Sequence, residues 1–138
     1  MKASRKLKAS MDKVNAFIRS LADQDAGRPA FAGMTYHKHI TGMNGHKMKV
    51  KVEILALSDG LYSVSFTSGN NTNIMTWSWS PDGDGVALSY EEQTGSDKTV
   101  DRWNQRAGGL LFHHQLKKQL NRRLDAFEQN LEAFTWQD

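Results

Sequence analysis

Hydrophobic and polar residues alternate with two different periods along this chain of 138 residues. Residues 11–21 carry apolar side chains at the three- and four-residue spacing of an amphipathic helix. Ser10 is a favourable N-cap for this helix, and the Gly-Arg-Pro sequence at 27–29 ends it. Between residues 31 and 94 the period changes to two, which is typical of strands with one buried face. The pattern predicts a short helix followed by a run of antiparallel strands.

Four strands of this run can be read directly from the alternation of side chains. They lie at residues 47–56, 62–67, 75–80 and 86–91. Apolar residues alternate with lysine and glutamate in the first of them, and mainly with serine and threonine in the others. Residues 2–9 are short and charged, but Ala3, Leu7 and Ala9 could share one face of an edge strand. With one more strand before residue 44, the sequence predicts about six strands.

Two tight turns order the strands that carry the tryptophans. Asp82-Gly83 as a two-residue turn pairs Trp79 with Val86 on the neighbouring strand. Asn70-Asn71 as a two-residue turn pairs Tyr62 with Trp79. The apolar side chains of both hairpins then lie on a single face of the sheet, which supports these registers.

The hairpin that precedes them requires a longer loop. A three-residue loop at 58–60, with its glycine in the left-handed conformation, sets Ile54 opposite Val64. A two-residue turn would instead place Phe66 opposite Glu53, and we reject it for that reason. Three hairpins therefore agree on one apolar face.

The first hairpin of the meander has two possible registers. A tight Asn44-Gly45 turn would direct His37 and His39 toward the buried face. A three-residue loop that begins at Met43 would direct Tyr36 and Ile40 inward instead, with the lysine between them on the same face. We favour the second register, because burial of an aromatic and an aliphatic side chain gains more free energy.

A long amphipathic helix closes the chain, with a predicted start between Thr99 and Trp103 and an end near Trp136. Its apolar stripe consists of Leu116, Leu120, Leu124, Phe127, Leu131 and Phe134. Gly108-Gly109 could mark the close approach of a ligand or a hinge. We favour a helix that kinks or starts later, because each glycine in a helix interior costs about 1 kcal/mol.

The sheet has one apolar face and the final helix has one apolar stripe. The simplest way to bury both is to lay the helix across the concave side of the twisted sheet. We therefore expect an α+β helix-grip fold, in which a sheet of about six antiparallel strands curves around the long C-terminal helix. Residues 1–138 are expected to form a single domain.

This order of elements resembles the START-like (SRPBCC, birch-pollen-allergen-like) helix-grip superfamily, which also includes polyketide cyclases. The features that carry the resemblance are the opening Lys6–Val14 segment and the final helix from Gly108 to Phe134. More narrowly, the Ser89–Glu92 strand before a basic C-terminal helix is similar to an uncharacterised Firmicutes family, domain of unknown function 3284. The chain has one strand fewer than many superfamily members, and its connector at 22–32 lacks a second helix.

The resemblance implies a cavity between the sheet and the final helix that holds a hydrophobic ligand. The residues expected to line it are Tyr62, Met75, Trp77, Trp79, Tyr90, Gly109, Phe112 and Leu116. Pockets of this kind are mostly apolar and carry a few polar groups. The alternative interpretation is that these side chains simply fill the core, because aromatic residues bury large areas in any fold.

Composition and motifs exclude several kinds of chemistry. The absence of cysteine excludes disulfides and thiolate catalysis. No Gly-x-Ser-x-Gly elbow is present, and Glu91 and Glu92 cannot share a strand face as an acid/base pair. The five histidines are not forced to converge, so we expect no metal and no cofactor. They are His37, His39, His46, His113 and His114. The basic N-terminus lacks an apolar signal core, and no stretch approaches the roughly 20 apolar residues of a membrane span, which favours a cytoplasmic protein. The resemblance to the Firmicutes family implies a bacterial one.

Three hypotheses for function follow. The leading one is a non-catalytic module that binds a small apolar or aromatic molecule. The second is a basic protein that binds nucleic acid or an acidic partner, but the net charge is only +3, which makes nucleic acid an unfavoured partner. The third is an enzyme of cyclase or hydrolase type that uses His37, His39 or Tyr90.

Overall fold

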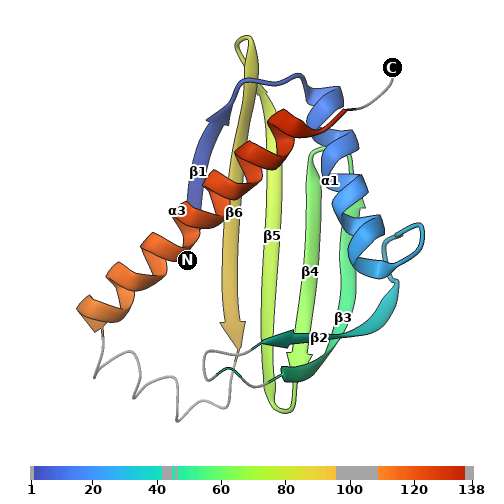
Figure 1. Cartoon of the computed structure of the whole chain (residues 1–138), viewed down its shortest axis with the longest axis vertical. Helices are drawn as coiled ribbons and strands as arrows, with labels where there is room; N and C mark the ends of the chain where they lie inside the picture. The colour runs from blue at the N-terminus through green and yellow to red at the C-terminus, as the bar shows by residue number, and fades with distance from the viewer. Residues whose placement is uncertain (1, 42–44, 46, 96–108, 136–138) are drawn as a thin grey trace.

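The computed structural model describes residues 2–41, 45, 47–95 and 109–135, and it describes no side chain at 109–117 or 119. The elements follow one another as β1 (Lys2–Leu7), α1 (Met11–Ala26), β2 (Thr35–Thr41), β3 (Lys47–Ser58), β4 (Leu61–Ser68), β5 (Asn71–Asp82), β6 (Gly85–Gly95) and α3 (Gly109–Ala133). The six strands form one antiparallel sheet in the order β1-β6-β5-β4-β3-β2. Both helices lie on one side of this sheet, where α3 crosses β1, β6 and β5 diagonally (Figure 1). The expected helix-grip architecture is confirmed.

Helix α1 begins and ends at the residues that the sequence predicts. The Ser10 side chain accepts a hydrogen bond from the backbone N–H of Lys13 at 3.2 Å. At the other end, Gly27 is left-handed, with φ of +75°, and ends the helix. Leu21, which the pattern placed on the apolar face, is 37% exposed, and Ala22 is buried in its place.

The β5–β6 hairpin has the predicted faces but a different register. Its two-residue turn is Gly83-Asp84, so Trp79 lies opposite Leu88 and not opposite Val86. Val86 pairs with Pro81. The glycine stands at the first turn position because φ is positive there, at +60°, and no other residue of the turn has positive φ. A shift of two residues leaves each side chain on its predicted face.

The β4–β5 hairpin departs from the prediction in the same way. The turn is Gly69-Asn70, and Tyr62 lies opposite Trp77 rather than Trp79. The first turn residue is again a glycine with φ of +60°. Both errors have one cause, since the position of the left-handed residue fixes the turn and the polar side chains do not.

The β3–β4 hairpin combines the pairing that we predicted with the turn that we rejected. Ile54 lies opposite Val64 as expected, but the turn is the two-residue Asp59-Gly60. A β-bulge at Leu55 takes up the extra residue and restores the apolar register. Gly60 has φ of +85°, as predicted, and a Cβ atom there would lie 3.0 Å from the backbone oxygen of Trp79.

The β2–β3 hairpin has the favoured register. Tyr36 lies opposite Val52, and Ile40 lies opposite Met48, so both point to the concave side. The burial that we expected for Ile40 is wrong, because this side chain is 36% exposed. His37 and His39 are exposed on the other face. Residues 42–44 and 46, which include most of the predicted loop, lie outside the described residues.

Strand β1 is an edge strand, as expected, and pairs with β6. Leu7 lies opposite Val86 and is buried, while Ala3 packs against the core from the same face. The pairing depends on a glycine at the start of β6. A Cβ atom on Gly85 would lie 2.3 Å from the backbone oxygen of Leu7, so a larger residue there would push β1 away.

Two groups of buried side chains fill the concave side of the sheet. The aromatic cluster consists of Leu7, Val14, Phe17, Ile18, Trp79, Val86, Leu88, Tyr90, Leu120, Leu124, Phe127 and Leu131. The aliphatic cluster consists of Ala22, Ala30, Met34, Val50, Val52, Ile54 and Val64. Helix α1 contributes to both, whereas the described side chains of α3 enter only the aromatic cluster.

The described part of α3 packs as the stripe predicts. Leu120, Leu124, Phe127 and Leu131 are buried against the sheet and α1, and Phe134 packs beside them. The helix ends at Ala133, slightly before the predicted end at Trp136. The predicted start between Thr99 and Trp103 lies outside the described residues, as does Gly108 of the glycine pair.

Candidate functional site

Tyr62 and Met75 lie where the two clusters meet, and each packs against both of them. Their neighbours on the same face of β4 and β5 are half-buried as well, and of these Phe66 packs against the aliphatic cluster and Trp77 against the aromatic cluster. We call this group the seam; it consists of Tyr62, Phe66, Asn73, Met75 and Trp77. The seam presents aromatic rings, a thioether and one amide on adjacent strands.

Trp77 forms the side of the seam that faces α3. Its ring lies 4.3 Å from the ring of Tyr90 and stacks on Phe127 with a centroid distance of 5.2 Å. One face of the indole is therefore held by the aromatic cluster. Trp77 as a whole residue is half-buried, unlike its fully buried neighbour Tyr90.

Trp79, which the sequence also placed among the lining residues, has a different environment. It is 5% exposed and belongs to the aromatic cluster. Its Nε1–H donates to Oδ1 of Asn15 at 2.6 Å, and the same oxygen accepts from the backbone N–H of Gly60 at 3.2 Å. The amide of Asn15 thus fixes the indole to α1 and to the β3–β4 turn.

A polar group borders the seam on the α3 side. Tyr90 is fully buried, and its hydroxyl oxygen accepts a hydrogen bond of 2.9 Å from the guanidinium of Arg123. The same guanidinium lies 3.5 Å from the Glu92 carboxylate. Burial, together with the Glu92 charge, raises the pKa of Tyr90 to about 12, so this phenol is neutral at any ordinary pH.

A second polar group borders the seam on the α1 side. The Asp25 carboxylate accepts hydrogen bonds from the Tyr36 hydroxyl and, at 2.7 Å, from the Lys38 ammonium. Lys38 Nζ lies 5.0 Å from the ring centroid of Phe66, in the geometry of a cation–π contact. Burial raises the pKa of Tyr36 far above its ordinary value, with the hydrogen bond to Asp25 adding to the effect.

Tyr62 stands between these two polar groups. Burial raises the pKa of its phenol to about 12, and the Asp25 carboxylate contributes in the same direction. The seam therefore carries one neutral hydroxyl group, and on each side of it the described residues include a carboxylate paired with a cation.

Asn73 is a polar member of the seam that sequence reasoning missed. It lies opposite Phe66 on β4 and opposite Thr94 on β6. Its Oδ1 atom is buried and accepts no hydrogen bond from the residues that the structure describes. The two-residue alternation that places Met75 and Trp77 on the concave face was a sufficient signal to find it.

The remaining predicted lining residues belong to α3. Gly109 is the first described residue of that helix. The side chains of Phe112 and Leu116 lie outside the described part of the chain. The structure thus brings Tyr62, Met75 and Trp77 together and places Trp79 in the aromatic cluster.

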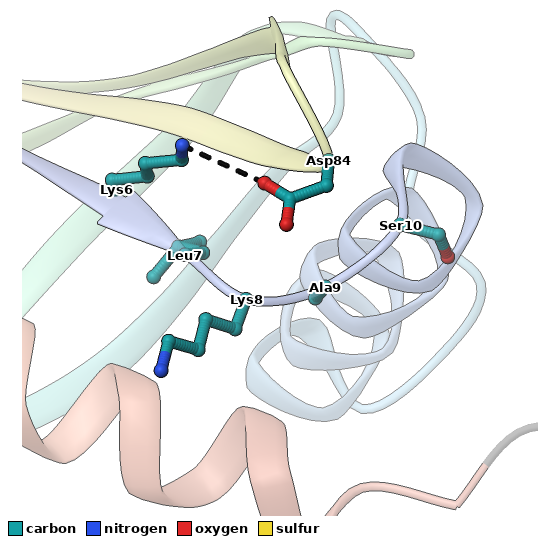
Figure 2. A pocket seen from close by; sticks show the side chains of 6 residues that line it. All are labelled: Lys6, Leu7, Lys8, Ala9, Ser10 and Asp84. Atoms are coloured by element: carbon teal, nitrogen blue, oxygen red, sulfur yellow. Dashed lines mark ion pairs between the residues drawn. The ribbon is translucent and has the colours of Figure 1, made fainter.

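A separate surface pocket of about 590 Å³ lies at the link between β1 and α1, at the opposite end of β5 from Asn73. It is lined by Lys6, Leu7, Lys8, Ala9, Ser10 and Asp84. Figure 2 shows Lys6 directed toward Asp84, at 3.6 Å, while Lys8 points to the other side of the chain. None of the residues that the sequence predicts to line the ligand cavity contributes to this pocket, so it is not the predicted cavity.

Neither a metal cluster nor a membrane-spanning helix is found among the described residues. Within them, no three His, Asp or Glu side chains gather closely enough to hold a metal ion, and His46, His113 and His114 are not among the described side chains. No helix within these ranges has the length and hydropathy that a membrane crossing requires.

The chain matches a known protein family over most of its length. Residues 1–113 match the family described as Domain of unknown function (DUF3284). No curated protein sequence matches the chain significantly.

Solved structures resemble the chain over almost its whole length. The protein TTHA0849 from Thermus thermophilus has a TM-score of 0.67 at 14% identity, covering 96% of this chain and 97% of that protein. Ara h 8.0201, a Bet v 1-like protein, has a TM-score of 0.65 at 10% identity, covering 97% of each chain. A conserved protein from Geobacillus kaustophilus has a TM-score of 0.62 at 12% identity, with coverage of 96% and 94%. At these identities the likeness shows the fold alone.

Proposed function

The chain belongs to the family described as Domain of unknown function (DUF3284) and has the START-like fold that its sequence resembles, and from this premise we propose that it binds a small apolar or aromatic molecule along the seam. The seam residues are Tyr62, Phe66, Asn73, Met75 and Trp77. In this proposal the ligand lies on β4 and β5 between the two clusters.

The observation that carries the proposal is the half-burial of Tyr62 and Met75 between two separate cores. Large apolar side chains that stay partly accessible on a concave surface, next to a few polar groups, are typical of small-molecule sites. Methionine adds a flexible, polarisable contact that adapts to different ring shapes. Trp77 offers a ring whose orientation is already fixed by stacking on Phe127, so binding orders few side chains.

A neutral, apolar probe tests the proposal directly. We expect 2-methoxynaphthalene to bind the purified chain saturably, with quenching of tryptophan fluorescence as the readout. Met75→Gln replaces the thioether and its methyl group with an amide, and we expect it to weaken binding by about tenfold, since it removes apolar contact equivalent to roughly two buried methylene groups.

Met48→Gln is the matched control, because Met48 is 38% exposed on β3 and lies outside the seam. We expect this variant to bind the probe as the natural chain does. Equal weakening by both substitutions, or no saturable binding up to the solubility of the probe, contradicts the proposal. Native mass spectrometry of freshly purified protein adds a second readout, since a bound molecule appears as a defined mass increment.

A further inference from the structure

The amide of Asn73 is the unusual group in the seam. Its Oδ1 atom is buried and has no hydrogen-bond donor among the described residues. Buried acceptors in folded proteins are almost always paired, because an unpaired acceptor loses its hydrogen bond to water without replacement. An acceptor of this kind on a proposed binding surface indicates that the partner carries a donor.

The position of Asn73 suits contact with a ligand. It lies two residues before Met75 on the same face of β5, so its Cα is about 6.6–6.8 Å from that of Met75 along the strand. The residue as a whole is only half-buried, and rotation about its terminal torsion angle is soft. The oxygen can therefore turn toward the seam without movement of the backbone.

The charges near the seam indicate what kind of donor fits. The Asp25 carboxylate lies 2.7 Å from the Lys38 ammonium, and the Glu92 carboxylate lies 3.5 Å from the Arg123 guanidinium. Each of these carboxylates is compensated by a cation of the protein itself. A cationic ligand would find no unpaired carboxylate among these groups, and the lysine and the arginine would repel it. A neutral hydroxyl group would lose no ion pair and would not be repelled.

We infer that the seam selects an aromatic or apolar molecule bearing a neutral hydroxyl group, and that this group donates a hydrogen bond to Asn73 Oδ1. The inference rests on the proposed function and names the ligand class for the same site. In this arrangement the ring of the ligand lies against Met75 and Trp77, and its hydroxyl is directed along β5 toward Asn73.

A pair of probes that differ only in the donor tests this assignment. 2-Naphthol carries a hydroxyl group, whereas 2-methoxynaphthalene carries the same ring system and oxygen without a donor. We expect the natural chain to bind 2-naphthol about three- to tenfold more tightly, which is the usual contribution of one neutral hydrogen bond. Isothermal titration calorimetry at pH 7 keeps the naphthol neutral and measures both affinities.

Variants of Asn73 assign the effect to its oxygen. Asn73→Leu removes the acceptor with little change of volume, and we expect it to abolish the preference while 2-methoxynaphthalene binds as before. Asn73→Asp keeps an oxygen acceptor and lacks the amide donor, so we expect it to retain the preference. Asn71→Leu is the matched control, because Asn71 is an exposed residue on the same strand.

Each outcome decides between the two proposals. If neither probe binds, the proposed function itself fails. If both probes bind the natural chain equally, or if Asn73→Leu raises the unfolding temperature but keeps the preference, the function stands and the role of Asn73 is overturned. Loss of the preference in Asn73→Asp would also overturn it, because the amide N–H would then be the group that recognises the ligand.

Discussion

The aromatic cluster and the aliphatic cluster lie on the same side of one sheet but are built in different ways. In the aromatic cluster, Phe17 of α1 lies 5.1 Å from Phe127 and 5.3 Å from Phe134, so two distant parts of the chain meet through rings. The aliphatic cluster contains alanine, valine, isoleucine and methionine from α1, the segment that follows it, β3 and β4. One core depends on the docking of α3, and the other is complete without its described side chains.

Hydrogen bonds between α1 and the segment that directly follows it hold the aliphatic cluster together. The backbone N–H of Ala30 donates to the Asp23 carboxylate at 2.7 Å, and the Ala30 carbonyl accepts from Arg19 at 3.1 Å. Both partners lie on α1, so the connection to β2 is held against the helix that precedes it. The difference teaches that the seam lies between a locally closed core and a core that requires the C-terminal helix.

The largest expected effect on stability comes from removing an aromatic ring from the aromatic cluster. Phe127→Ala removes the contacts with Phe17 and Trp77, and we expect it to lower the free energy of unfolding by about 3–5 kcal/mol. Val52→Ala removes a fully buried side chain of the aliphatic cluster, with an expected loss of about 2 kcal/mol. Urea unfolding measures both. Equal losses in the free energy of unfolding would contradict the expectation that the aromatic cluster contributes more to stability than the aliphatic cluster.

A medium effect is expected from the amide that joins α1 to Trp79. Asn15→Ala leaves the buried Nε1–H of Trp79 without its acceptor and should cost about 1–3 kcal/mol. The loss should shrink in the Trp79→Phe background, where no indole N–H needs a partner. A double-mutant cycle from urea unfolding measures the coupling, and a coupling near zero would contradict the role that we assign to this hydrogen bond.

The smallest expected effect concerns the titration of the seam. Because the pKa of Tyr62 is raised from 10 to about 12 in the folded chain, the unfolded chain loses this proton first. The stabilisation is complete below pH 10 and is lost as the pH rises toward 12, by roughly 1–2 kcal/mol for a half-buried phenol. Tyr62→Phe should flatten the fall of the unfolding temperature between pH 10 and about pH 12, which is the window between these two pKa values. An unchanged profile would show that the phenol titrates as it does in the unfolded chain.

The sequence was sufficient to predict the fold because two periodicities agree. The stripe of Leu120, Leu124 and Leu131 needed an apolar surface, and the alternating strands supplied one. The same reasoning misplaced two hairpins by two residues, because a shift of two returns every side chain to its own face. Only the left-handed position of Gly69 and Gly83 distinguishes the registers, and that position depends on backbone geometry.

The candidate site was predicted only in part, for a different physical reason. Alternation identifies which residues share a face, so Tyr62, Met75 and Trp77 were expected together. It does not show how far each lies beneath a helix, which is why Trp79 was placed beside them although Asn15 holds it in the aromatic cluster. Nor does it show whether a polar side chain finds a partner, and the buried oxygen of Asn73 is visible only in three dimensions.

The pairing of β1 with β6 has a consequence for how the chain acquires its shape. Every other strand pairs with the next one along the sequence, whereas Leu7 must find Val86 across the rest of the sheet. Contacts between residues so far apart in the sequence form slowly, so β1, which is translated first, is expected to be among the last strands to pair. Until then β6 presents a long open edge to neighbouring chains, and pairing replaces it with the shorter, lysine- and arginine-bearing edge of β1, which is a poorer template for aggregation.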